Sequence, residues 1–271
     1  MIEAKVIEDS ISTSGVRITT LQLKYHRYIH GEFMTHRVFS RNASSSRAIP
    51  VKTMLSQVWN DPAMPEYWGA NKSGMQAGGA ILGPRKDVIK FVWKTAAKAA
   101  CVAAWSMMKL GLHKQWANRV LEPWQFIHVI VTATEWDNFM ELRYHNDAQP
   151  EIFALARAVK IARTVSKPKE LKHGEWHLPY ITEAERNEYD LKTLQKMSTA
   201  RCCRVSYLKH DGTKPNVEDD LKLYDRLVGS RPLHASPLEH IATPSRGDNT
   251  WSGNLRGWVQ YRKQVEKEHG L

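Results

Sequence analysis

Residues 33–47 read Phe-Met-Thr-His-Arg-Val-Phe-Ser-Arg-Asn-Ala-Ser-Ser-Ser-Arg and combine cations with short hydroxyl side chains. His36 and Arg37 stand near the start of this segment, three serines follow, and Arg47 closes it. Fixed cations and small hydrogen-bond donors, on a backbone that a ligand can approach closely, are what a phosphate and a planar heterocycle require. Taken alone, the same residues also suit a solvated polar loop. Whether this segment binds a ligand or is a solvated loop therefore has to be judged from other segments of the chain.

Three further segments carry polar side chains in compact groups. Residues 138–152 read Asn-Phe-Met-Glu-Leu-Arg-Tyr-His-Asn-Asp-Ala-Gln-Pro-Glu-Ile and place Asn138, Arg143 and Gln149 beside a helix break at Pro150. Residues 201–207 read Arg-Cys-Cys-Arg-Val-Ser-Tyr, and residues 236–240 read Ser-Pro-Leu-Glu-His.

These four segments resemble the sequence blocks of flavin-dependent thymidylate synthases. The first is similar to the family's Arg-His-Arg signature, seven residues and a serine, and stands here as Thr35-His36-Arg37 with Ser45. The second resembles Asn-Phe-x-x-Leu-Arg followed by Ala-Gln-x-Glu-Ile. The third and fourth are similar to the Ala-Arg-Val-Ser-Phe and Pro-Phe-Glu-His blocks. Four blocks with matching internal spacing are hard to obtain by chance.

The order of the blocks differs from the family, in which the third and fourth precede the first. The resemblance therefore implies a circular permutation and covers roughly residues 16–50, 115–166 and 197–240. Permutation is tolerated when the parent's termini lie close together at the surface. We expect a single domain over residues 1–271. The family's C-terminal part would lie at 16–166, a connector at 168–195, the family's N-terminal part at 197–240 and a basic C-terminal segment at 245–271.

The resemblance also implies roles for individual residues. Arg143 would act on the pyrimidine, where a planar guanidinium can bond the ring edge and stabilise negative charge as the ring is activated. The residues implied to hold FAD are His36, Arg37, Asn138, Ser206 and His240, and those implied to hold the nucleotide are Ser45, Ser46, Arg47, Arg119, Arg143 and Gln149.

The implied reaction moves a one-carbon unit from methylenetetrahydrofolate to C5 of a pyrimidine deoxynucleotide monophosphate, most directly dUMP to dTMP. In the family, reduced FAD supplies the electrons, NADPH recharges the flavin, and homotetramers build active sites between subunits. The protein then has to orient the reactants and shape the electrostatics around the cofactor. A formal net charge of +11 suits a site that collects several anions.

Four departures from the family pattern leave more than one pyrimidine nucleotide open as the substrate. Thr35 replaces the first arginine of the signature, Ala43 replaces its glutamate, and residues 132–134 read Thr-Ala-Thr where the family has Asn-x-Arg. Glu122 places an acid near the expected phosphate site. A related C5 methylase or hydroxymethylase acting on dUMP or dCMP is therefore an alternative.

An alternative of another class is a basic nucleic-acid-binding protein without flavin, with residues 256–263 as its contact helix. Lysine and arginine are spread along the whole chain among acids, which favours small anionic ligands and makes a nucleic-acid partner less expected. Cys101, Cys202 and Cys203 form neither a disulfide pattern nor a metal-ligand spacing, and we expect no metal site. With no membrane-spanning run or signal peptide in the sequence, we expect a cytoplasmic protein without a membrane partner.

The elements that must position these residues indicate an α+β fold, in which an antiparallel sheet is flanked by long helices. The order of these elements along the chain would be permuted relative to the flavin-dependent thymidylate synthase fold. Alternating apolar residues predict strands within residues 1–30. Helices are predicted from about 87 to 110, from 134 to about 165 with an interruption near Pro150, and from Asn216 to about Gly229. Residues 60–84 are expected to form a functional loop, and residues 168–195 a charged connector.

Overall fold

The structure, a computed structural model, describes residues 1–205, 213, 216–229, 231–247 and 249–270. Ser206, one of the residues implied to hold FAD, lies outside this range. The α+β expectation is confirmed, because the described chain combines a five-stranded sheet with many helices. The strand order is β3-β4-β2-β1-β5, and every neighbouring pair is antiparallel except β1 with β5. The strands are β1 (Glu3–Ser12), β2 (Arg17–His26), β3 (Ser40–Ala43), β4 (Phe126–Ala133) and β5 (Lys169–Leu171).

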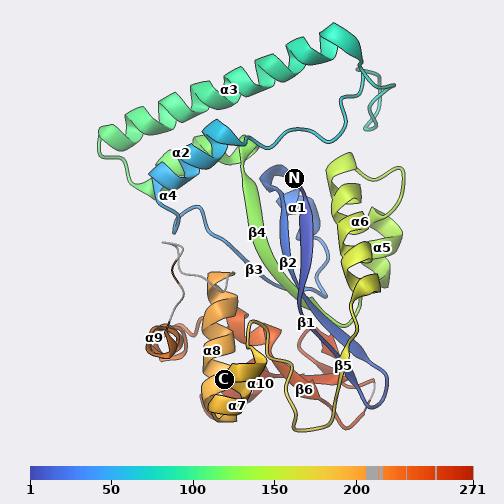
Figure 1. Cartoon of the computed structure of the whole chain (residues 1–271), viewed down its shortest axis with the longest axis vertical. Helices are drawn as coiled ribbons and strands as arrows, with labels where there is room; N and C mark the ends of the chain where they lie inside the picture. The colour runs from blue at the N-terminus through green and yellow to red at the C-terminus, as the bar shows by residue number, and fades with distance from the viewer. Residues whose placement is uncertain (206–212, 214–215, 230, 248, 271) are drawn as a thin grey trace.

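The helices gather in three places around this sheet (Figure 1). Helices α5 and α6 run beside the sheet, α2 to α4 lie across one end of it, and α7 to α10 lie toward the other end. None of the described helices is long and apolar enough to cross a membrane. The α-helices are α1 (His30–Phe33), α2 (Val51–Asn60), α3 (Gly83–Lys109), α4 (Lys114–Ala117), α5 (Asp137–Arg143), α6 (Pro150–Val165), α7 (Glu183–Glu188), α8 (Leu191–Arg204), α9 (Val217–Val228) and α10 (Tyr261–Glu268), and the 3-10 helices are η1 (Arg27–Ile29), η2 (Asn118–Trp124) and η3 (Ser236–His240).

The two faces of the sheet differ in chemistry because successive residues of a strand point to opposite sides. One face buries alternating apolar residues, including Leu21, Leu23 and Val131, against α5 and α6. The other face carries hydroxyl side chains, and Thr20 and Thr132 stand directly opposite each other on β2 and β4. This hydroxyl-bearing face is the one that meets the C-terminal part of the chain, through His177 and His240.

Most of the predicted elements are present. The strands expected within residues 1–30 are β1 and β2, and the predicted first helix is α3. The break near Pro150 separates α5 from α6, and Pro150 is the first residue of α6, where a missing N–H costs nothing. Asn216 caps α9 together with Asp219 in a reciprocal pair of hydrogen bonds.

Two predicted segments are different in the structure. Residues 168–195 are more than a connector, because they contain β5, α7 and the start of α8, and β5 pairs with β1. The predicted contact helix at 256–263 is wrong over residues 256–260, and only residues 261–263 are helical, as the start of α10. Residues 255–260 form β8 (Leu255–Arg256) and β9 (Trp258–Gln260), which lie between β7 (Trp251–Ser252) and α10 and bury Trp258 completely. Strand β9 pairs with β6 (Ala242–Pro244).

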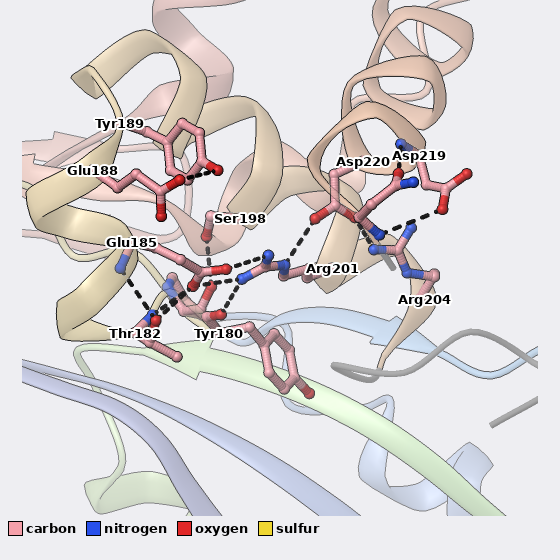
Figure 2. A network of polar contacts seen from close by, with 12 residues as sticks. Tyr180, Thr182, Glu185, Glu188, Tyr189, Ser198, Arg201, Arg204, Asp219 and Asp220 are labelled. Atoms are coloured by element: carbon pink, nitrogen blue, oxygen red, sulfur yellow. Dashed lines mark hydrogen bonds and ion pairs between the residues drawn. The ribbon is translucent and has the colours of Figure 1, made fainter. Parts of the chain in front are cut away.

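An ion-pair network fixes α7, α8 and α9 to one another (Figure 2). The Arg201 side chain is only 2% exposed and donates to both oxygens of Glu185, at 2.7 and 2.9 Å, and to Asp220 at 2.9 Å. A further N–H of Arg201 donates to the Tyr180 carbonyl oxygen at 2.7 Å. Arg204 pairs with the second oxygen of Asp220. Because removing one partner would leave a charge buried without compensation, the network holds the three helices in one arrangement.

Candidate functional site

Arg143, the last residue of α5, is the centre of a cluster of polar side chains. Its Nε donates to His36 Nε2 at 2.9 Å, one terminal nitrogen pairs with Glu32, and the other donates to Thr35 Oγ1 at 3.3 Å. A guanidinium carries five N–H donors. These three contacts therefore leave one N–H on each terminal nitrogen for a ligand.

His36 is held neutral at this position. Burial lowers its pKa to about 4, with the positive charges of Arg143 and Arg41 acting in the same direction and a hydrogen bond with Asn138 opposing them. A neutral imidazole has one acceptor nitrogen, which is why its Nε2 can accept from Arg143. The Phe139 ring packs against the His36 ring in an edge-to-face arrangement, with centroids 5.0 Å apart. The ring is therefore fixed both by packing and by its polar contacts.

Arg41 on strand β3 fixes the loop that carries His36. One terminal nitrogen of Arg41 lies within hydrogen-bond distance of the carbonyl oxygens of His36 (2.9 Å), Met34 (3.0 Å) and Phe33 (3.4 Å). Neither Arg41 nor Glu32 was among the predicted site residues. The basic character of residues 36–47 pointed toward Arg41, whereas no motif in the sequence singles out Glu32.

Three predicted residues lie at the surface around this cluster. Arg37, Asn138 and Gln149 are exposed, and no carboxylate in the described part of the chain pairs with Arg37. Asn138 reaches back to His36, and Gln149 stands at the start of α6. The structure thus brings His36, Asn138 and Arg143 together and leaves exposed donors beside them.

A second cluster brings Ser46 and Arg119, both predicted to hold the nucleotide, to one carboxylate, and it adds Arg27 and Glu122, which the sequence did not assign to a ligand. The Glu122 carboxylate lies 2.7 Å from Arg119 and 3.1 Å from Arg27, and it accepts from the Ser46 hydroxyl at 3.5 Å. Asn118 anchors the backbone of this loop by donating to the carbonyl oxygens of Ser46 and Ile49, at 2.8 and 3.0 Å. The predicted Ser45 and Arg47 are exposed on the same turn.

His240 lies on the other face of the sheet and is completely buried. Its Nδ1 lies 2.8 Å from Thr132 Oγ1, and its Nε2 lies 3.1 Å from the Asn42 amide. Because both ring nitrogens are bonded within the protein, direct contact between His240 and a cofactor does not agree with this arrangement. Asn42 follows Arg41 on the edge strand β3, so His240 supports that strand from the opposite side.

The bond from His240 to Thr132 is one link of a buried hydrogen-bond chain. Thr132 Oγ1 lies 2.6 Å from Thr20 Oγ1, which lies 2.7 Å from His177 Nε2. His177 Nδ1 in turn lies 2.9 Å from Ser10 Oγ. We name this series from Ser10 to Asn42 the hydroxyl–histidine chain.

The two histidines of the hydroxyl–histidine chain are neutral at pH 7. Burial lowers the pKa of His240 to about 3, and burial followed by the charge of Arg186 lowers that of His177 well below its ordinary value. A neutral imidazole donates from one nitrogen and accepts at the other, so each link fixes the direction of the next. The direction of the chain therefore decides whether His240 Nε2 donates to the Asn42 amide or accepts from it.

The candidate site is thus built around β3, with the Arg143 cluster on one side, His240 behind it and the Glu122 cluster at the loop that follows. Within the described residues, no three His, Cys, Asp or Glu side chains gather closely enough to hold a metal ion. Cys101 and Cys202 are buried, and burial raises the pKa of both thiols.

The structure and the sequence were compared with known proteins, and only the comparison with solved structures found matches. No protein-family model matches the sequence, and no curated protein matches it either. Among solved structures, the UMP/dUMP methylase PolB from Streptomyces cacaoi bound with 5-Br dUMP superimposes with a TM-score of 0.51 at 15% identity, over 60% of this chain and 90% of that chain. The chain has the PolB fold.

Two further solved structures were found with lower scores. PolB bound with 5-Br UMP gives a TM-score of 0.47 at 15% identity, over 60% of this chain and 89% of that chain. Thymidylate Synthase X from Helicobacter pylori with FAD and dUMP gives 0.40 at 15% identity, over 54% of this chain and 67% of that chain. The match to PolB bound with 5-Br dUMP extends over most of the methylase but over only 60% of this chain.

Proposed function

We propose that this chain is a flavin-dependent enzyme that transfers a one-carbon unit from methylenetetrahydrofolate to C5 of a pyrimidine deoxynucleotide, converting dUMP to dTMP with NADPH as reductant. The observation that carries the proposal is the Arg143 cluster, in which His36, Glu32 and Thr35 orient a guanidinium that keeps two N–H donors for a ligand. A fold shared with a UMP/dUMP methylase supports the reaction class.

Arg143 would bind the pyrimidine edge and stabilise the negative charge that develops when the ring is activated at C5. Its orientation is set before the substrate arrives, because three side chains already hold it. Preorganised donors of this kind typically contribute 10²- to 10³-fold to a rate. Neutral His36 would hold Arg143 in place without adding a second positive charge.

The residues around this cluster fit FAD in part. Arg37 and Asn138 are exposed donors next to His36, which suits the phosphates and the polar ring edge of a flavin. His240 fits only in support, through Asn42, since its own nitrogens are engaged. When bound, the flavin would supply the electrons that reduce the transferred carbon to a methyl group.

The nucleotide phosphate would lie at the second cluster, where Ser45, Ser46, Arg47 and Arg119 provide hydroxyl and guanidinium donors. Ser46 is buried, and Asn118 fixes its backbone, so this donor is preorganised. Ser45, Arg47 and Arg119 are exposed enough to meet a ligand from solvent. Gln149, at the start of α6, would complete the nucleotide contacts.

We also propose that the chain is a single permuted domain that assembles as a homotetramer. Helix α3 supports the assembly because its outward side presents small and apolar residues at alternating spacings of four and three, namely Val88, Val92, Thr95, Ala99 and Val102. This spacing is that of a coiled-coil seam. The three valines are each more than half exposed on a helix about 40 Å long, which is room for another copy of α3.

The test of the proposed reaction is flavin binding together with product identity. The purified protein, loaded with FAD, should convert dUMP to dTMP when methylenetetrahydrofolate and NADPH are supplied. A colourless protein that takes up no added FAD would contradict the flavin dependence. Product from dCMP, or a hydroxymethylated product from either nucleotide, would replace dUMP methylation with the related C5 reaction.

A further inference from the structure

We propose that Glu122 is a built-in competitor for the nucleotide phosphate: its carboxylate occupies the anion site formed by Arg27, Ser46 and Arg119 until a phosphate monoester displaces it. This inference rests on the proposed function for the identity of the nucleotide, but its geometry is independent of the reaction. It assigns a regulatory role to a residue that differs from the family pattern.

The contacts of Glu122 are those of a bound anion. A single oxygen, Oε1, meets Arg119 Nη1 at 2.7 Å, Arg27 Nη2 at 3.1 Å and Ser46 Oγ at 3.5 Å. The three donors come from η2, η1 and the loop after β3, so they converge from separate parts of the chain. An ion pair between neighbouring residues of η2 would need only Arg119 and Glu122. The additional contacts from Arg27 and Ser46 make this a site that binds an anion from several sides.

The charge balance of this cluster favours an incoming phosphate. Two guanidinium groups face one carboxylate, and the exposed Arg47 on the same turn adds a further cation. A phosphate monoester carries nearly two negative charges at neutral pH and three acceptor oxygens. It can therefore offer a separate oxygen to each of the three donors, which share a single oxygen of Glu122.

Displacement of Glu122 needs only a side-chain rotation. The Glu122 side chain is 27% exposed and can turn toward solvent, while Pro123 follows it and restricts the local backbone. Two of the three donors stay in place, because Asn118 anchors the Ser46 backbone and the Arg27 side chain is only 19% exposed, whereas Arg119 is 48% exposed and would turn toward the phosphate. The phosphate site thus persists when Glu122 leaves it.

The experiment compares binding of inorganic phosphate, dUMP and deoxyuridine to the wild-type chain and to Glu122→Gln by isothermal titration calorimetry. Glutamine keeps the shape of the side chain and removes the competing charge. We expect phosphate and dUMP to bind about tenfold more tightly to Glu122→Gln, the factor that corresponds to one charged contact weakened by partial exposure. Deoxyuridine should bind equally to both proteins.

Glu218→Gln is the matched control, because it removes the same charge from a pair with Lys222 on the exposed surface of α9. It should bind phosphate like the wild type. Unchanged or weaker phosphate binding by Glu122→Gln would overturn the role of Glu122. Should that variant not fold, Arg119→Gln provides the second measurement, since phosphate binding unaffected by loss of Arg119 would also overturn the proposal. Tighter phosphate binding without binding of dUMP would support the anion site and count against the proposed substrate.

Discussion

Replacing Thr132 by valine tests whether the hydroxyl–histidine chain stabilises the protein. The Thr132 hydroxyl contacts Thr20 at 2.6 Å and His240 at 2.8 Å, and valine keeps nearly the same shape without the hydroxyl. Thr20 retains its bond to His177, whereas His240 Nδ1 would be buried without a partner. One orphaned buried group and one lost hydrogen bond together correspond to about 2–4 kcal/mol of unfolding free energy.

Urea unfolding followed by circular dichroism measures this loss, with an unchanged slope showing that the surface exposed on unfolding is the same. Thr132→Ser is the matched control, because it keeps the hydroxyl and removes one buried methyl group, worth about 1 kcal/mol. If Thr132→Val were no less stable than Thr132→Ser, the buried hydrogen bonds would not stabilise the fold and the reasoning would be refuted.

Four further outcomes are expected. Arg201→Met should cost about 3–5 kcal/mol in urea unfolding, because the completely buried Asp220 loses one of its cations and the 15%-exposed Glu185 loses its own, and a loss below about 1 kcal/mol would contradict this. Arg143→Lys should lower kcat for dTMP formation about 10²- to 10³-fold with unchanged circular dichroism, whereas a near-normal kcat would remove Arg143 from the chemistry. Because the pKa of His36 is about 4 in the folded protein and 6.5 in the unfolded chain, the unfolded chain binds more protons between these values. Unfolding free energy should then rise more steeply with pH from about 4 to 6.5 in the wild type than in His36→Asn, by up to about 1.4 kcal/mol per pH unit, and identical profiles of the two proteins would contradict it. Val92→Glu on the outward side of α3 should reduce the assembly to smaller species in sedimentation velocity while leaving chain stability within about 0.5 kcal/mol, and an unchanged mass would exclude this surface.

The sequence predicted the elements whose apolar pattern is strong. Alternation of apolar residues predicted β2, and the run of helix-forming residues ending at Gly111 predicted α3, although this helix starts at Gly83 rather than near residue 87. Helix α8 was not predicted, because it buries polar side chains such as Gln195, Ser198 and Arg201, which weaken the apolar periodicity on which such predictions depend.

The candidate site was predicted where residues are close in sequence or belong to a recognised block. His36, Asn138 and Arg143 do lie together. The partners that fix them were not predictable, because their bonds join distant segments: His177 meets Thr20 across 157 positions of the chain. The sequence also gave no sign that His240 would lie behind β3, since the face on which a side chain lies depends on tertiary packing.

The most direct test of the central proposal is a single-turnover reaction of the FAD-loaded, pre-reduced protein with dUMP and methylenetetrahydrofolate. Mass spectrometry identifies the nucleotide product, and the flavin absorbance reports its oxidation in the same sample. We expect dTMP to form in step with flavin oxidation, and both to slow in Arg143→Lys. Unmodified dUMP beside a flavin that stays reduced, or a protein that binds no flavin, would contradict the proposed function.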